Sequence, residues 1–138
     1  MIFTKEIVFP SQGFTDIINI TDMVADLIKQ STVTEGLVTL SVPGSTAGIT
    51  TIEYESGLIK DLKKAFEKLA PEKSSYAHDD AWGDGNGFSH VRAALLGASR
   101  SFPVNKGRVL LGTWQQIVLI DFDNRPRERR IAVQVMGE

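Results

Sequence analysis

Alternating apolar and polar side chains predict several strands in this chain. Ile131, Val133 and Val135 share one face of residues 128–136, because successive side chains of a strand point to opposite sides. Strand patterns also cover residues 2–9, 15–20, 37–42, 48–54, 101–104 and 108–122. The turn at 123–126 favours a hairpin between the last two strands. The pattern therefore predicts about seven strands.

Helical spacing of apolar residues predicts about three helices. It is clearest over residues 58–69, where leucines recur on one face and lysines lie opposite. A second helix is expected over residues 22–31, with the Thr21 hydroxyl as its N-cap. A third is expected near residues 88–97. Residues 71–87 are polar and show no period, so we expect a long loop there.

These elements indicate a single α+β domain over residues 1–138. The strands are joined mostly by short turns and not by helical crossovers. That connectivity argues for antiparallel sheets in a sandwich-like arrangement, and against a doubly wound parallel sheet. A domain of this length buries roughly two-thirds of the surface that its unfolded chain exposes, which is enough for a core without disulfide bonds.

Composition and charge exclude several classes of protein. The chain has no cysteine, which rules out disulfide frameworks, thiolate zinc sites and cysteine nucleophiles. The net charge is −2, from 15 basic and 17 acidic residues, so nothing attracts the whole chain to nucleic acid or to an anionic membrane. The N-terminal residues do not match a signal peptide, and no apolar run approaches the ~20 residues that span a bilayer. We expect a cytoplasmic protein with neither nucleic acid nor membrane as a partner.

Residues 76–90 contain the most chemically distinctive side chains. They include both histidines of the chain, His78 and His90, together with Asp84 and Asn86. Two imidazoles and a carboxylate can bind a divalent metal. They can equally supply a proton donor and a proton acceptor near neutral pH. A solvated turn with a hydrogen-bonded core histidine is the alternative that needs no function.

Two other segments offer groups that suit an anionic ligand. Ser45 and Thr46 stand in a small-residue loop whose hydroxyl and N–H groups can cradle an anion, although a plain β-turn has the same composition. Arg127 shares a strand face with Arg129, and such a pair can bind a phosphate or a carboxylate in a bidentate manner. A charged edge strand that opposes aggregation is the alternative for these arginines.

Polar residues interrupt the strand predicted over 108–122. Trp114, Gln115 and Gln116 stand in the middle of an otherwise apolar run. A buried amide costs roughly 1–3 kcal/mol unless it is hydrogen-bonded. These residues therefore indicate a lined pocket, or else a face that contacts solvent or another subunit.

Taken in order, the motifs of the chain resemble those of the YjbQ family. The similar segments are Pro43-Gly-Ser-Thr-Ala-Gly, Thr51-Ile-Glu53, Tyr76-Ala-His78, Gly83-Asp84-Gly-Asn86-Gly-Phe-Ser-His90, Leu95-Leu-Gly97-Ala-Ser99, Gly107-Arg-Val-Leu-Leu-Gly112-Thr-Trp114-Gln115 and Pro126-Arg127-Glu-Arg129. They span nearly the whole sequence. One departure is Gly44, where many members have histidine after the proline. This chain therefore has one fewer group that could bind metal or transfer protons.

The resemblance implies an antiparallel α+β fold that assembles as a homotrimer, with sites near subunit boundaries. It also implies the activity of some members, which resemble secondary thiamin phosphate synthases and join a pyrimidine diphosphate to a thiazole phosphate. The catalytic residues expected on this basis are His78, His90, Asp84 and Glu53. The residues expected to bind the phosphorylated small molecule are Ser45, Thr46, Asn86, Trp114, Gln115 and Arg127.

A divalent metal, zinc or magnesium, is expected as the cofactor, with His78 and His90 as its ligands. Two other functions fit the same residues. One is a non-catalytic trimeric module that binds a divalent metal or an anionic metabolite. The other is a structural oligomer whose polar residues only satisfy one another.

Overall fold

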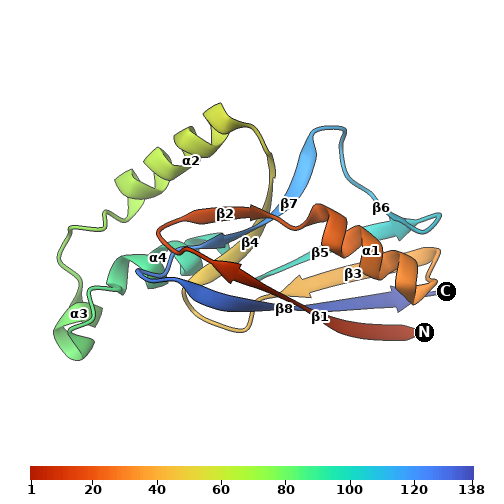
Figure 1. Cartoon of the computed structure of the whole chain (residues 1–138), viewed down its shortest axis with the longest axis horizontal. Helices are drawn as coiled ribbons and strands as arrows, with labels where there is room; N and C mark the ends of the chain where they lie inside the picture. Colours follow the sequence, from red (N-terminus) through yellow and green to blue (C-terminus); the bar gives the residue numbers. More distant parts are fainter.

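The computed structural model describes all residues from 1 to 138 and contains two antiparallel sheets and four helices (Figure 1). The strands are β1 (Ile2–Ser11), β2 (Asp16–Asn19), β3 (Glu35–Ser41), β4 (Ala47–Glu53), β5 (Ser99–Asn105), β6 (Arg108–Val109), β7 (Gln115–Asp121) and β8 (Arg127–Gly137). The helices are α1 (Thr21–Ser31), α2 (Ser56–Leu69), α3 (Ala77–Trp82) and α4 (Gly87–Leu96). The predicted α+β class is confirmed.

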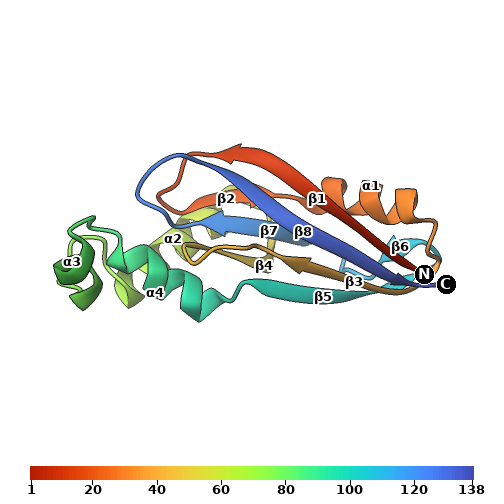
Figure 2. The same ribbon diagram turned by 90° about the horizontal axis from the view of Figure 1, so that it is seen from below.

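The two sheets pack face to face around the main core (Figure 2). The larger sheet has the strand order β1-β8-β3-β5-β6, and the smaller has the order β2-β7-β4. Val38 and Val133 of the larger sheet are fully buried in one cluster with Ile49 and Leu119 of the smaller sheet, and Val24 of α1 joins them. The sandwich-like arrangement expected from the alternating pattern is therefore confirmed.

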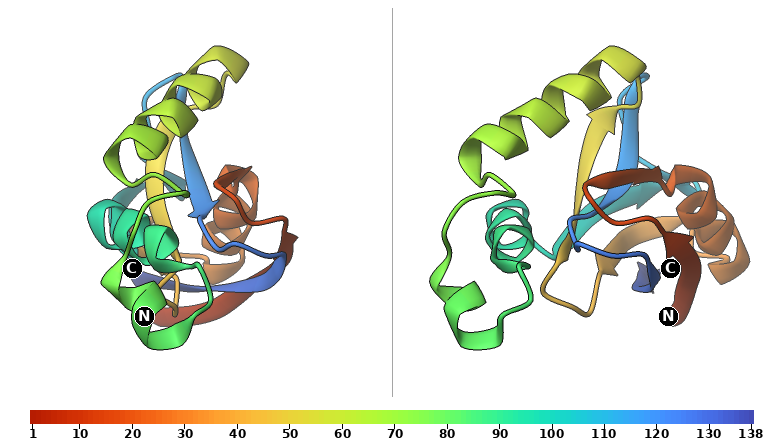
Figure 3. Two further views of the ribbon diagram at one scale, coloured as in Figure 1. Left: turned by 90° about the vertical axis from the view of Figure 1, so that its left-hand side faces the viewer. Right: turned by 60° about the vertical axis from the view of Figure 1, so that its left-hand side comes forward.

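Helices α2 and α4 cover the other face of the smaller sheet (Figure 3). Val118 of β7 packs there with Phe66 of α2 and Ala93 of α4 in a second apolar cluster. The ring of Phe66 meets that of Phe122 edge-on, with ring centroids 4.8 Å apart. This layer leads into α3, which stands beyond the end of the sheets (Figures 1 and 2).

Two predictions about the C-terminal strands are wrong. The segment 108–122 is not one strand, because β6 pairs with β5 in the larger sheet whereas β7 lies in the smaller sheet. Strands β7 and β8 consequently do not form a hairpin, and β8 pairs with β1 and β3 instead. An alternating pattern identifies a strand and its buried face, but it does not identify the strand's partner.

The helices differ from the predictions at two places. The segment 71–87 contains α3, which at six residues is too short to show a periodic pattern. Thr21 begins α1 and does not cap it, since the N-cap residue is Ile20, which has no side-chain cap. The Thr21 hydroxyl instead accepts the N–H of Ile117 at 2.8 Å, which joins α1 to β7.

None of the four helices has both the length and the apolar character needed to cross a bilayer.

Candidate functional site

The two histidines lie side by side where α3 approaches α4. His78 stands in the first turn of α3 and His90 in that of α4. Their ring centroids are 4.3 Å apart, with the ring planes tilted by 38°. Gly83 and Gly85 both have a φ of 65°, a conformation that glycine adopts without strain, and they reverse the chain between the helices. The sequence prediction that the histidines come together in one site is consistent with this geometry.

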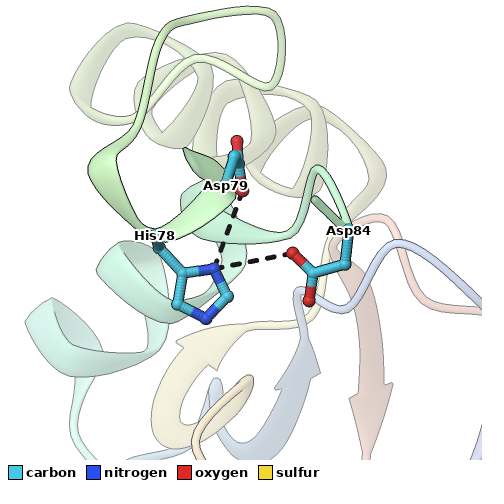
Figure 4. A group of neighbouring side chains, drawn as sticks. All are labelled: His78, Asp79 and Asp84. Atoms are coloured by element: carbon cyan, nitrogen blue, oxygen red, sulfur yellow. Dashed lines mark ion pairs between the residues drawn. The ribbon is translucent and has the colours of Figure 1, made fainter. Parts of the chain in front are cut away.

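Two carboxylates face Nδ1 of His78 (Figure 4). Asp79 Oδ1 lies 3.6 Å from this nitrogen, and Asp84 Oδ1 lies 3.5 Å from it. The nitrogen itself is buried and makes no hydrogen bond. Sequence reasoning selected Asp84 but missed Asp79, because neighbouring residues of a helix do not normally face each other. These three side chains and His90 form what we call the histidine site.

The environment of His90 favours its neutral form. Burial lowers the pKa of His90 below its ordinary value of 6.5, and the neighbouring His78 lowers that pKa further. Asp84 and Asp123 act in the opposite direction without outweighing these effects. A neutral imidazole can accept a proton at neutral pH.

A buried ionic network lies next to the histidine site. Asp123 Oδ2 accepts hydrogen bonds from the Thr46 hydroxyl and from Nε of Arg127, each at 2.9 Å. Arg129 donates two bonds of 2.7 Å to the Asp121 carboxylate and a third of 2.7 Å to the Thr46 hydroxyl. Burial alone would raise the pKa of Asp123, but the Thr46 hydroxyl and the charge of Arg127 outweigh burial and lower it.

This network changes the roles expected for two residues. The Thr46 hydroxyl already donates one hydrogen bond and accepts another, so it is a member of the fold's own hydrogen-bond network. Arg127 uses only Nε within the chain, and its side chain is 37% exposed, so its terminal nitrogens are available. Sequence reasoning missed Asp121 and Asp123. Their two-residue spacing, which matches that of the two arginines, was the signal that could have found them.

A polar hollow of about 330 Å³ borders the histidine site, and we call it the arginine hollow. Its lining residues are Asp84, Asn86, Asn124, Arg125 and Arg127. The buried Asn86 Oδ1 accepts the N–H of Asn124 at 3.1 Å and the hydroxyl of Ser89. Asn86 therefore fixes the loop after β7 to the start of α4, next to the arginines.

A second hollow, of about 400 Å³, is lined in part by His90, and we call it the alanine hollow. Ser45 and Gly44 form part of its wall. The remaining lining residues are small: Ala47, Ala93, Ala94, Gly97 and Ala98. Ser45 is therefore near His90, as expected for a residue of the same site.

Glu53 and Trp114 do not join the histidine site within one chain. Strand β4 runs from Ala47, beside the alanine hollow, to Glu53 at its far end. A strand rises 3.3–3.4 Å per residue, so Glu53 lies about 20 Å from Ala47 and the alanine hollow. It lines a separate hollow of about 480 Å³ together with Trp114, whose side chain is 73% exposed.

Gln115 also lies at the far end of the smaller sheet, opposite Glu53 in the β4–β7 register. Its side-chain amide donates to the Thr51 hydroxyl at 3.0 Å, and its oxygen accepts the N–H of Gly112 at 2.9 Å. The amide is thus satisfied by the fold. The cost of burying an unpaired amide therefore gives no reason of its own to place Gln115 in a pocket.

Comparisons with known proteins give close relatives over the whole chain. A UPF0047 protein of Methanothermobacter thermautotrophicus is 36% identical over 137 residues, which are 99% of this chain and 94% of the relative. The UPF0047 protein YugU of Bacillus subtilis is 33% identical, over 88% of this chain and 90% of the relative.

Solved structures share the fold. A protein of unknown function from Sulfolobus solfataricus superimposes with a TM-score of 0.94 at 32% identity, covering 100% of this chain and 99% of that one. A YjbQ/UPF0047 protein from Clostridium acetobutylicum gives a TM-score of 0.87 at 29% identity, over 96% and 99% of the two chains. The family model described as "UPF0047 protein YjbQ-like" matches residues 5–138. The chain therefore belongs to the YjbQ family, as its ordered motifs predicted.

Proposed function

We propose that this chain is a small-molecule enzyme that acts on a phosphorylated substrate, in the manner of a secondary thiamin phosphate synthase. Such an enzyme joins a pyrimidine diphosphate to a thiazole phosphate and releases diphosphate. The observation that carries the proposal is the position of the paired His78 and His90 beside the arginine hollow. A reaction that releases diphosphate needs groups that move protons and groups that stabilise negative charge.

Arg127 is the residue proposed to bind the phosphate. Its Nε is anchored at 2.9 Å to the buried Asp123, so the guanidinium is oriented before any ligand arrives. The terminal nitrogens remain available, and Arg125 adds a second positive charge to the same hollow. A pre-oriented guanidinium binds phosphate more tightly because less freedom is lost on binding.

His78 or His90 is proposed to supply a proton to the departing diphosphate, because the two imidazole rings lie together beside the arginine hollow. A divalent cation, zinc or magnesium, is also part of the proposal. A cation neutralises the charge that develops on departing diphosphate.

A second candidate function is a non-catalytic module, trimeric and binding a divalent metal or an anionic metabolite. Gly44 favours this alternative. Many members of the family have histidine at this position, and here the residue lines the alanine hollow beside His90. The missing imidazole leaves one fewer group for proton transfer, whereas the guanidinium of Arg127 is retained.

Replacing Arg127 tests the phosphate site. Arg127→Lys should weaken the binding of pyrophosphate and of thiamin phosphate about ten- to a hundredfold, because an ammonium cannot make the planar two-pronged contact and such bonds contribute roughly 1.5–3 kcal/mol. Calorimetric titration measures the affinity. Arg130→Lys is the matched control, since Arg130 lies on the other face of β8 and pairs with Glu6 and Glu128 at the surface.

If the parent and both variants bind pyrophosphate and thiamin phosphate with equal affinity, the arginines form only a charged edge strand and do not bind phosphate. No binding by the parent would remove the phosphate proposal. Turnover separates the two candidate functions. The enzyme hypothesis is supported if the parent releases diphosphate from a mixture of the pyrimidine diphosphate and the thiazole phosphate, and if His90→Gln does not. Binding without turnover supports the module.

A further inference from the structure

Two buried side-chain polar atoms of the molecule make no hydrogen bond, and one of them is Nδ1 of His78. Leaving a buried polar atom unpaired costs roughly 1–3 kcal/mol. Such an atom therefore calls for an explanation, and a bound ion is one of them. The surroundings of this nitrogen favour that explanation, because the atoms facing it are carboxylate oxygens.

The two nitrogen–oxygen distances suit a tetrahedral ion. One nitrogen of His78 and one oxygen each of Asp79 and Asp84 all lie within 4.8 Å of one another. The two nitrogen–oxygen separations are 3.6 and 3.5 Å. Two ligands of a tetrahedral zinc ion, each about 2.0–2.1 Å from the metal, lie about 3.4 Å apart. An octahedral ion with the same bond lengths requires a shorter separation of about 3.0 Å.

The backbone holds both carboxylates in place. Asp79 Oδ1 accepts the N–H of Gly87 at 2.8 Å, and Asp84 Oδ1 accepts the N–H of Asn86 at 3.1 Å. A side chain at residue 87 would come within 3.1 Å of Asp79 Oδ1 and within 2.5 Å of Tyr76, so only glycine permits this approach. Hydrogen bonds of this kind orient metal ligands and raise affinity.

His90, which the sequence suggested as the second imidazole ligand, does not share an ion with His78. The rings face each other at 4.3 Å with a tilt of 38°. The lone pairs of an imidazole nitrogen lie in the plane of its ring, so two facing rings do not direct them to one point. His90 is therefore a neighbour of this group and not a member of it.

We propose that His78 Nδ1, Asp79 Oδ1 and Asp84 Oδ1 form a site for one divalent cation of the zinc class. Three protein ligands leave a fourth position for water or for a substrate oxygen. One imidazole with two carboxylates favours zinc or manganese over calcium and magnesium, which prefer oxygen ligands alone. The inference rests on the proposed function in one respect, because the proposed function is what gives the cation a role. Metal binding itself is measured without any substrate.

Cobalt and zinc test the site directly. Chelator-stripped protein titrated with Co²⁺ should take up one ion per chain and develop the visible absorption of tetrahedral cobalt, and calorimetry should give the zinc affinity. Asp79→Asn and Asp84→Asn should each weaken zinc binding by at least about tenfold, because even outer partners of metal ligands are worth 10–100-fold. Circular dichroism of each variant confirms that it is folded.

Asp80→Asn is the matched control. Asp80 follows Asp79 in the same short helix but lies outside the group of ligand atoms. This variant and His90→Gln should keep the affinity of the parent. Unchanged affinity in folded Asp84→Asn would overturn the inference, and so would an equal loss in Asp80→Asn. Failure of the folded parent to bind millimolar zinc would do the same.

The outcome is distinguishable from that of the proposed function. Pyrophosphate binding that depends on Arg127, in a protein that binds no zinc, would overturn this inference and leave the proposed function standing. Zinc binding that depends on Asp84, in a protein without affinity for pyrophosphate, would support this inference and remove the phosphate proposal.

Discussion

Asp123 is a fully buried carboxylate whose two oxygens differ in their surroundings. One oxygen accepts hydrogen bonds from Thr46 and Arg127, and the other has no partner. Burial raises the pKa of Asp123, but the Thr46 hydroxyl and Arg127 lower it overall, below the ordinary value of 3.8. A carboxyl group with a lowered pKa in the folded state stabilises the fold at neutral pH. That stabilisation is lost as the pH falls below 3.8 and through the folded pKa.

Thr46→Val should lower the free energy of unfolding at pH 7 by about 1–3 kcal/mol, because Asp123 and Arg129 each lose a hydrogen-bond partner. The difference from the parent should narrow as the pH falls and Asp123 takes up its proton. Urea unfolding measures this difference in the free energy of unfolding at about pH 7, 5 and 3.5, values on either side of an ordinary carboxyl pKa. Thr39→Val is the control, since its hydroxyl meets that of Ser101 at an exposed position. Equal losses in both variants would argue against a stabilising network.

The residues of the candidate site were predictable from the sequence only where they are close along the chain. His78, Asp84, Asn86 and His90 fall within one short segment, so their meeting needed only a turn. The carboxylates and arginines of the network around Asp123 are also close along the chain, but Thr46 is not. Thr46 comes from the connection before β4, 77 residues before Asp123, and its contact with Asp123 depends on the tertiary fold.

At the level of the elements, Arg92 connects three parts of the chain. It lies in α4 with only 2% of its surface exposed. Its guanidinium donates to the carbonyl of Ala70, to the hydroxyl of Thr15 and to the carboxylate of Glu67, at 2.8–2.9 Å. It also lies 5.0 Å from the ring centre of Phe88. Arg92 thereby fixes α4, and with it His90, to the end of α2 and to the β1–β2 connection.

Arg92→Met should lower the free energy of unfolding by about 2–5 kcal/mol, since several buried hydrogen bonds to a charged group are lost together. Chemical denaturation of the two proteins measures the loss. Arg130→Met provides a comparison at an exposed arginine, for which a change within about 0.5 kcal/mol is expected. If Arg92→Met lowers the free energy of unfolding by less than about 1 kcal/mol, the loss is smaller than one such bond contributes. Arg92 would then not hold α4 in place.

Element predictions held where the signal is local. Helix α2 was expected over residues 58–69 and spans Ser56–Leu69, with the Glu55 carboxylate accepting the N–H groups of Gly57 and Leu58 at its start. The break between β6 and β7 was missed because apolar residues stand on both sides of it, and the polar residues at Gln115 and Gln116 were interpreted as part of one strand. Residues 117–120 are buried on both faces of the smaller sheet, as its central strand requires, and a continuous apolar run is the signature of such a strand.

At the level of the whole molecule, the residues predicted from the family motifs fall into two regions. The length of β4, calculated from the rise of a strand per residue, separates these regions by about 20 Å. One region holds the histidine site and the arginine hollow. The other holds Glu53 and the exposed Trp114. Two regions that one chain keeps apart are compatible with the expected homotrimer, in which a neighbouring chain can cover either of them.

The chain is expected to form a homotrimer of about 46 kDa, three times its 15.2 kDa. The small side chains of the alanine hollow permit the close approach of a neighbouring backbone, and Ala94 is an exposed member of this set. Ala94→Arg should therefore dissociate the assembly, because it places a long charged side chain where close contact is expected. Ala25→Arg, on the exposed face of α1, should leave it intact. Sedimentation velocity at micromolar protein measures the mass, and a single monomeric species in the parent would contradict the prediction. A trimer in all three proteins would place the interface away from the alanine hollow.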